Sequence, residues 1–383
     1  MSNFLCKTLI RAPHLLTISP YPNLRCFQLL YLSYTTTVSD SNSFTISYLI
    51  NSCSFSPASA SSASKRVTFH SPEKPDSVIS FFKNRGFSNA QISFIIGKYP
   101  RVLLSDPNKT LLPKFQFLYS KGASDSEVLK IIAKAPKILK RSVKEYLVPS
   151  FDFLKGYLQS NERTIASIER FPSVIADCRQ NHLSGSVRML LDVGVPEANV
   201  MYHLLYNPRM FTMTLDRLRE ILEDVLKMGF DPSKSTFMPA VCCIGGLSKS
   251  TWLRKLGVYK RWGLSEEHIL AAFRGHPSFM ALSEEKIMLG MDFFVNKLGW
   301  EAAAVVKNPV LLSFSLKNRT IPRASVLQFL FQKGLTKKLF MLVTPYRYTE
   351  NQFLQKYVHP YLEKVPQLSK FYHVYAHDGI NRL

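Results

Sequence analysis

A proline recurs along this chain every 36 residues, each time at the start of the same short phrase. The phrase is proline, one variable residue and two hydrophobic residues, and it opens at Pro100, Pro136, Pro172 and Pro208. It returns at Pro277 and Pro309 after a longer gap. Self-similarity at a fixed period of this length is typical of stacked helical units that bury their apolar faces against their neighbours. The sequence therefore predicts an all-α helical-repeat solenoid with repeats of about 35 residues.

Glycines form a second periodic landmark. They suit the left-handed residue that ends a helix, and they stand at Gly86, Gly122, Gly194, Gly229, Gly263, Gly299 and Gly334. Polar residues follow them, and Ser88 with Gln91 and Ser124 with Glu127 match the capping box that begins a helix. Each repeat is thus expected to hold a short first helix, the proline turn and a second helix.

The second helix has a landmark of its own, thirteen residues after the proline of the turn. It is a proline in three repeats and a glycine in two, and we expect this residue to bend or thin the helix so that it packs on the next unit. The positions are Pro113, Pro149, Pro322, Gly185 and Gly290. Two stretches depart from the pattern, 156–161 and 239–246, and there the helices are expected to persist with altered details.

The charge of the chain points to an anionic partner. Lysine and arginine number 49 against 27 acidic residues, a net charge of +22. Such an excess favours nucleic acid or an anionic membrane surface, although a basic surface that only keeps the protein soluble is the alternative. No stretch has the ~20 apolar residues of a membrane span. Six cysteines without a CxxC pair are expected to be reduced thiols.

The N-terminal segment has the composition of an organellar transit peptide. Residues 1–39 contain Lys7, Arg11 and Arg25 but no acidic residue. We predict a transit peptide over 1–40, with the mitochondrion favoured and the chloroplast as the alternative. Residues 41–74 are expected to be a linker or a degenerate first repeat, 75–365 the repeat domain and 366–383 a C-terminal tail.

Basic residues recur in phase with the proline turn. They lie just before it or directly after it, at Lys98, Arg101, Lys134, Lys137, Arg170, Arg209, Arg274 and Lys307. Once the repeats stack, one cation per unit becomes a line of positive charge that could follow a phosphate backbone. The alternative is that these side chains cap helix ends and face water. Further candidates at helix starts are Lys140, Arg141, Arg254, Lys255 and Arg261.

The proline turn at this spacing, together with the run from Leu316 to Arg323, resembles the plant branch of the mitochondrial transcription termination factor (mTERF) family. The resemblance covers roughly residues 75–365. It implies a superhelix of helical triplets whose basic concave face holds double-stranded nucleic acid, in organellar transcription termination or initiation. Some members act in organellar RNA splicing or ribosome assembly. Arg319 and Arg323 join the candidates because they lie in the family-like run.

No catalytic constellation emerges from the sequence. The stretch 245–251 lacks the glycine spacing of a phosphate loop, and the tetratricopeptide and pentatricopeptide patterns are absent. We therefore expect a non-enzymatic, monomeric protein without metal or cofactor. Its partner would be double-stranded DNA or structured RNA, with the organellar transcription machinery as a further partner. Three functions stay open: transcription regulation on duplex DNA, RNA binding in splicing or ribosomal RNA maturation, and a protein-binding scaffold.

Overall fold

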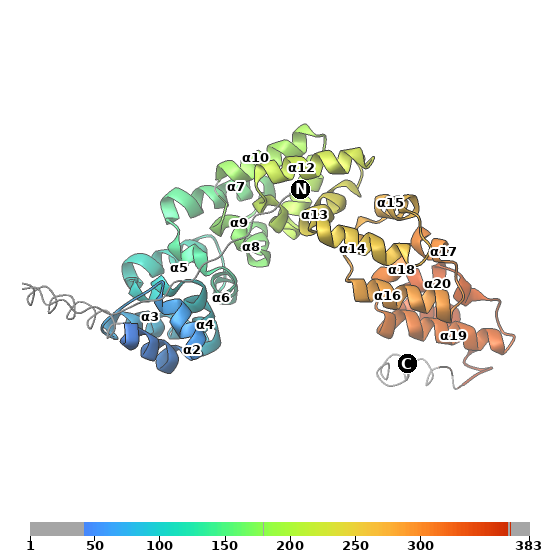
Figure 1. Ribbon diagram of the computed structural model, residues 1–383, viewed down its shortest axis with the longest axis horizontal. Helices are drawn as coiled ribbons and strands as arrows, with labels where there is room; N and C mark the ends of the chain where they lie inside the picture. Colours follow the sequence, from blue (N-terminus) through green and yellow to red (C-terminus); the bar gives the residue numbers. More distant parts are fainter. Residues whose placement is uncertain (1–41, 179, 367, 369–383) are drawn as a thin grey trace, which may run out of the picture. The chain divides into compact units, whose positions relative to one another are not determined.

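The computed structural model describes residues 42–178, 180–366 and 368, and this part of the chain consists of helices joined by short turns, with no β-strand (Figure 1). The all-α helical-repeat prediction is confirmed. The expected transit peptide, and all but residues 366 and 368 of the expected tail, lie outside the described residues. The chain divides into two compact units, the first ending at Pro113 and the second beginning at Lys114. Each unit is described by itself.

The first unit contains helical residues 42–53, then α2 (Pro57–Ser64), α3 (Glu73–Lys83), α4 (Asn89–Lys98), the 3₁₀ turn η1 (Pro100–Leu104), the π-turn η2 (Pro107–Leu111) and the start of α5 (Leu112–Ser120). In the described part of the segment predicted as a linker or degenerate first repeat, residues 42–74, helices alternate with short irregular stretches. Leu49 and Ala60 are fully buried there. The Thr45 hydroxyl also donates to the carbonyl of Phe69 and accepts from its amide, which joins both ends of the segment.

The second unit repeats one pattern: a first helix, a short turn and a second helix. Its elements are α6 (Asp125–Lys134), η3 (Pro136–Lys140), η4 (Val143–Leu147), α7 (Val148–Leu158), α8 (Asn161–Arg170), α9 (Ser173–Ala176), α10 (Gln180–Asp192), α11 (Glu197–Tyr206), η5 (Pro208–Thr212), α12 (Leu215–Lys227), α13 (Phe237–Gly246), α14 (Lys249–Lys260), α15 (Glu266–Gly275), η6 (Pro277–Ala281), α16 (Glu284–Asp292), η7 (Phe293–Lys297), α17 (Ala302–Lys307), α18 (Val310–Ser313), η8 (Leu316–Thr320), α19 (Ile321–Gln332), η9 (Leu339–Met341), α20 (Thr344–Arg347), α21 (Glu350–Tyr357) and η10 (His359–Tyr361).

First helices of successive repeats pack side by side. α6 packs against α8, α8 against α11, and α15 against α17. The proline turn between the helices is a 3₁₀ turn in most repeats, as at η3, η5 and η6, and its proline is buried with the two hydrophobic residues that follow the variable position. Because the turn buries one edge of every unit, the hydrophobic pair that defines the phrase belongs to the core.

The predicted helix ends are confirmed. All seven landmark glycines have positive φ, between 70° and 101°. Ser88 and Ser124 each form the complete capping box with the residue three positions later. In the irregular stretch 156–161, Gln159 takes the left-handed conformation instead, with φ 59°. The displaced glycine there, Gly156, lies within α7.

Replacing two glycines with alanine is expected to give opposite changes in stability. Gly122 has φ +94°, and Gly156 is helical; a Cβ atom on either would meet nothing within 4 Å. Gly122→Ala should lower the free energy of unfolding by about 1–2 kcal/mol because the left-handed backbone strains an L-residue. Gly156→Ala should raise it by about 0.5–1 kcal/mol through helix propensity. Urea unfolding of both variants measures this, and equal signs would contradict it.

The proline or glycine that lies inside the second helix, thirteen residues after the turn proline, affects the helix in two different ways. Before each landmark proline the helix opens with a π-turn, and the preceding residue donates to the carbonyl five residues back, as Leu112 does to Pro107. Val148 and Ile321 do the same. A proline ring clashes with the carbonyl four residues back, and the wider turn relieves that clash. The glycines instead lack a side chain, so a residue of the next repeat can pack close to the helix backbone. A Cβ on Gly290 would lie 2.7 Å from Cδ2 of Leu312 in the next repeat.

The repeat between α12 and α15 departs most from the pattern. Its first helix, α13, begins late and runs through Pro239 to Gly246, where the other repeats have the proline turn. α13 packs against α12 and η6. Both helices of this unit are present, as expected, but the 3₁₀ turn is missing. The row of first helices is therefore interrupted between α11 and α15.

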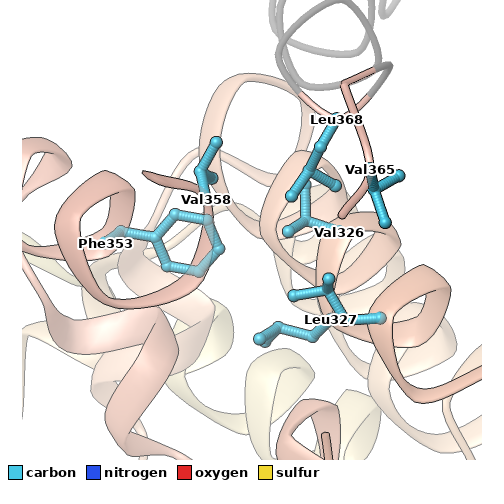
Figure 2. Close-up of a cluster of buried hydrophobic side chains, with 7 residues drawn as sticks. Val326, Leu327, Phe353, Val358, Val365 and Leu368 are labelled. Carbon is cyan, nitrogen blue, oxygen red and sulfur yellow. The ribbon is translucent and has the colours of Figure 1, made fainter. Parts of the chain in front are cut away.

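The C-terminal elements close the second unit. Val326, Leu327 and Leu330 of α19 form a buried cluster with Phe353 of α21 and the segment behind it (Figure 2). This cluster covers the last apolar helix face, as terminal repeats of helical arrays must do. Among the described residues, no helix combines the length and apolar character needed to span a bilayer.

Candidate nucleic-acid interface

The eight basic residues that recur in phase with the proline turn lie at the C-terminal ends of the first helices or in the turn that follows, as their spacing predicts. Lys98, Lys134, Arg170 and Lys307 are the last residues of α4, α6, α8 and α17, and Arg274 is the next-to-last residue of α15. Arg101, Lys137 and Arg209 are the second residues of the 3₁₀ turns that follow. All eight side chains are exposed. Within the second unit, the packing of first helices places consecutive members of the set on neighbouring helix ends.

Two of these cations bridge neighbouring repeats. Lys134 donates from Nζ to the carbonyl oxygen of Glu169 at 2.7 Å. Arg170 donates from Nη1 to the carbonyl oxygen of Leu205 at 3.1 Å. Both acceptors lie in the last turn of the next first helix, where carbonyls lack intrahelical partners and the helix dipole is negative. The helix-capping alternative therefore holds here, yet ammonium and guanidinium groups keep further donors, so these cations can still meet a phosphate.

The other six cations of this set differ in the hydrogen bonds and ion pairs that their side chains make. Lys137 forms an ion pair with Asp177 at 3.0 Å, and Arg101 donates to the carbonyl of Arg66 at 3.2 Å. Arg274 makes a long hydrogen bond to Met228. Within residues 42–178, 180–366 and 368, the side chains of Arg209 and Lys307 make no hydrogen bond or ion pair. In the same part of the chain, the contact given for the Lys98 ammonium is the ring of Phe94, 5.5 Å from its Nζ. Lys98, Arg209 and Lys307 are the cations most available to a ligand.

The structure corrects the two candidates from the C-terminal run. Arg323 is 1% exposed, and its Nη1 donates to the carbonyls of Pro345, Tyr346 and Tyr348 at 2.6–3.2 Å. Its Nη2 pairs with Glu350 at 3.1 Å. A guanidinium buried in this way is out of reach of nucleic acid.

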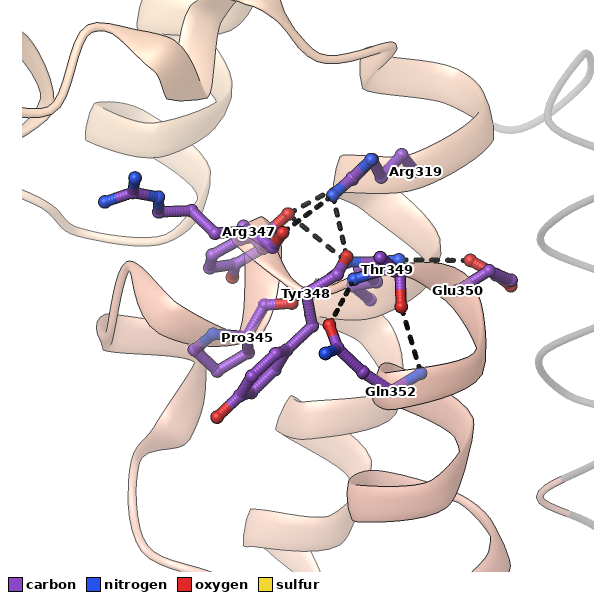
Figure 3. A network of polar contacts seen from close by, with 9 residues as sticks. Arg319, Pro345, Arg347, Tyr348, Thr349, Glu350 and Gln352 are labelled. Carbon is purple, nitrogen blue, oxygen red and sulfur yellow. Dashed lines mark hydrogen bonds and ion pairs between the residues drawn. The ribbon is translucent and has the colours of Figure 1, made fainter.

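Arg319, which is half-buried, binds the same stretch. It donates to the carbonyls of Tyr346, Arg347 and Tyr348 at 2.7–3.2 Å (Figure 3). Both arginines hold the C-terminal elements in place. Among the further candidates, Lys255 is also buried and donates to the carbonyl of Met280. Arg254 pairs with Glu284, whereas Arg141 donates to the carbonyl of Ala176. Lys140 and Arg261 are exposed.

Two aromatic side chains beside Arg170 belong to this surface although the sequence analysis passed them over. Tyr202 and Tyr206 of α11 are 54% and 47% exposed, with their ring centroids 4.7 Å apart. The Arg170 guanidinium lies 4.8 Å from the Tyr206 centroid. The signal that could have found them is their spacing, because two tyrosines four residues apart share one helix face. Exposed aromatic rings next to cations are common where unpaired bases bind.

The four cysteine thiols in the described part of the chain are not activated as nucleophiles. Burial raises the pKa of the Cys53, Cys178 and Cys242 thiols to about 12 and that of Cys243 to about 11. These four cysteines are free, as predicted, and Cys6 and Cys26 lie outside the described residues. Thiols with raised pKa values are inert. Among the described residues, no group of three His, Cys, Asp or Glu side chains could hold a metal ion.

Acid is expected to destabilise the protein through His203. Burial lowers the pKa of this imidazole to about 4. In the unfolded chain this imidazole takes up its proton near pH 6.5, whereas in the folded chain it does so only near pH 4. Between pH 6.5 and pH 4 the unfolded state therefore binds more protons than the folded state. The free energy of unfolding should fall by up to about 3 kcal/mol as the pH drops through that range. His203→Asn should lack this component in urea titrations at several pH values, whereas the exposed control His268→Asn should retain it.

Comparison with known proteins agrees with this architecture. The sequence model of the mTERF family matches residues 79–233 and 236–354, most of the chain. The chain belongs to the mTERF family. A relative from Arabidopsis thaliana, "Transcription termination factor MTERF8, chloroplastic", is 24% identical over 146 residues, or 38% of this chain. The match spans only 29% of that relative's length. Family membership and a plant relative agree with the resemblance to the plant mTERF branch.

Proposed function

We propose that this mTERF protein is an organellar, non-enzymatic regulator of transcription that binds double-stranded DNA through its first-helix ends. The observation that carries the proposal is an exposed cation in the last turn of five first helices, at Lys98 in the first unit and at Lys134, Arg170, Arg274 and Lys307 in the second. Within the second unit, α6 packs against α8 and α15 against α17, so these cations lie on neighbouring helix ends, and phosphate contacts of this kind position a protein on a duplex. The excess of basic over acidic residues in the whole chain points the same way.

Salt dependence tests the proposal. Binding of the full chain to a fluorescent 30-base-pair duplex of arbitrary sequence is measured by anisotropy from 50 to 300 mM salt. We expect the logarithm of the affinity to fall linearly with the logarithm of the salt concentration, by about 0.9 for every phosphate neutralised. No detectable binding at 50 mM salt would remove both the DNA and the RNA function and leave the scaffold function.

RNA binding is a second candidate, favoured by the exposed Tyr202 and Tyr206 beside Arg170. Sequencing of nucleic acid crosslinked to the protein in isolated organelles separates the two ligands. Import of the labelled chain into isolated mitochondria and chloroplasts tests the location. The transit-like composition of 1–40 favours the mitochondrion, whereas the Arabidopsis relative is named as chloroplastic.

A further inference from the structure

Three side chains that are ligands of soft metal ions meet at the irregular repeat. Sγ of Cys242 in α13 lies 3.9 Å from Nδ1 of His203 in α11 and 3.6 Å from Sδ of Met210 in η5. The cysteine is 39 and 32 positions away from its two neighbours, so only the packing of this repeat brings the three donors together. Cys242 belongs to the stretch of α13 that stands where the other repeats have the proline turn.

The separations between these donor atoms fit a single shared ion. Nitrogen and sulfur ligands lie about 2.0–2.3 Å from a bound metal ion, which places two ligands about 3.5–4.0 Å apart when the angle between their bonds is about 109–120°. Both distances from Cys242 Sγ are within this range. The donors of the described chain therefore stand as they would around an ion.

The imidazole of His203 presents the correct nitrogen to this site. Asn207 donates from Nδ2 to Nδ1 of His203 at 3.2 Å, so Nδ1 carries a lone pair and the ring proton is on Nε2. The side chain of Asn207 is exposed. Its amide can therefore turn to water and leave the lone pair of Nδ1 to a metal ion.

The surroundings favour a monovalent ion. A cavity of about 570 Å³ is lined by His203 and Cys242 and gives an ion a path to them, and no charged side chain of the described residues lines it. A thiolate, a neutral imidazole and a thioether carry one negative charge in total, so a monovalent cation makes the site neutral. A divalent ion would leave a positive charge beside the buried side chains of His203 and Met210, which is costly. Thiolate and thioether ligands also select Cu⁺.

We propose that Cys242, His203 and Met210 bind one Cu⁺ ion. Binding replaces the thiol proton of Cys242, which passes to solvent, and the ion keeps its oxidation state. The bound ion joins α13 to α11 and η5 in the repeat that lacks the proline turn. The inference is independent of nucleic-acid binding, and it departs from the sequence-based expectation of a protein without metal, because methionine was not considered there as a ligand.

The test titrates the reduced full chain with Cu⁺ in the absence of oxygen, in competition with the chromogenic chelator bathocuproine disulfonate. We expect the wild-type chain to retain one equivalent of Cu⁺ that Cys242→Ser loses. Cys243→Ser is the matched control, since it removes the neighbouring free thiol of the same helix and should retain that equivalent. Met210→Leu and His203→Asn should each weaken binding at least about tenfold, the lower end of what the loss of even an outer-shell partner costs.

X-ray absorption at the copper edge identifies the ligands directly. The wild-type spectrum should contain one nitrogen at about 2.0 Å and two sulfur atoms at about 2.3 Å, and His203→Asn should lose the nitrogen. Cu⁺ should also slow amide exchange in α13 of the wild-type chain, by up to about 100-fold at a free concentration of about 100 Kd. Cys242→Ser should exchange at the wild-type rate without Cu⁺ and show no such slowing, which excludes misfolding as the cause.

The opposite results overturn the site. Equal Cu⁺ binding by the wild-type chain and Cys242→Ser, or loss of the equivalent in Cys243→Ser alone, would mean that the ion binds other thiols adventitiously. Unchanged affinity in both Met210→Leu and His203→Asn would have the same meaning. Displacement of the ion by an equal concentration of Zn²⁺ would overturn the assignment to a monovalent ion. Each of these results leaves the proposed binding of duplex DNA untouched.

Discussion

Arg323→Ala is expected to loosen the C-terminal elements by about 2–4 kcal/mol, since it leaves buried acceptors without a donor. In the native chain the guanidinium satisfies three carbonyls between Pro345 and Tyr348 and pairs with Glu350. It also lies 4.7 Å from the ring centroid of Phe353, which belongs to the buried C-terminal cluster. Removal of this side chain thus takes away the hydrogen bonds and the ion pair by which Arg323 joins α19 to α20 and α21.

Hydrogen exchange measures this loss locally, which is preferable in a repeat array whose unfolding need not be two-state. Amides of α21 should exchange about 30- to 1,000-fold faster in Arg323→Ala, the equivalent of 2–4 kcal/mol. Arg323→Lys keeps the charge but presents a single nitrogen, so its effect should be intermediate. Arg347→Ala is the control, because that side chain is exposed and points away from the network (Figure 3). Unchanged exchange in Arg323→Ala would show that the hydrogen bonds are not what holds these helices.

The periodic features of the sequence predicted the fold because each one has a local cause. Glycine after a helix, serine with glutamine or glutamate at a helix start, and proline in the turn each act through the backbone of a few residues. That is why the positive φ of Gly86 and the capping box at Ser88 match the expectation. The missing turn of the irregular repeat could not be predicted in detail in this way. α13 begins at Phe237 and runs through the position of the turn, and it packs against α12 and η6, which are distant in sequence from the residues that would form the turn.

The burial of Arg323 was missed although the repeat register contains the signal. It directly follows Pro322, and the residues in the same position after Pro113 and Pro149 are Lys114 and Ser150, which are 9% and 0% exposed. From composition alone an arginine is expected on the surface, and the position of Arg323 in the family-like run favoured its interpretation as a nucleic-acid contact. Comparison of equivalent positions across repeats would have placed this residue inside.

The same comparison extends to the irregular repeat. Lys255 stands eight residues before the helix-ending Gly263, as Lys114 stands eight before Gly122, and both lysines are buried. Burial also lowers the pKa of each ammonium group. These basic residues serve the packing between helices. At the first-helix ends, by contrast, the basic side chains remain exposed, which supports the proposal that they contact the ligand.

Replacing Lys98, Arg209 and Lys307 together with alanine is expected to weaken duplex DNA binding by up to about 500-fold at 0.1 M salt. Each phosphate contact contributes a slope of about 0.9, which is about a factor of 8 in affinity at that concentration. The salt slope should fall by about 2.7 at the same time. The side chains of these three residues make no hydrogen bond or ion pair within the described part of the chain, so their loss should leave the free energy of unfolding nearly unchanged.

A matched control removes the same charge from another surface. Arg217, Arg219 and Lys227 lie on the second helix α12, where each pairs with a nearby acid, namely Glu220, Asp216 and Glu223. Their replacement with alanine lowers the net charge of the chain equally, yet we expect the affinity to change by less than about threefold because paired surface cations attract phosphate weakly. Equal losses from the two triple variants would mean that binding follows total charge and not position in the repeat. A loss confined to the first triple would place the phosphate backbone along the first-helix ends.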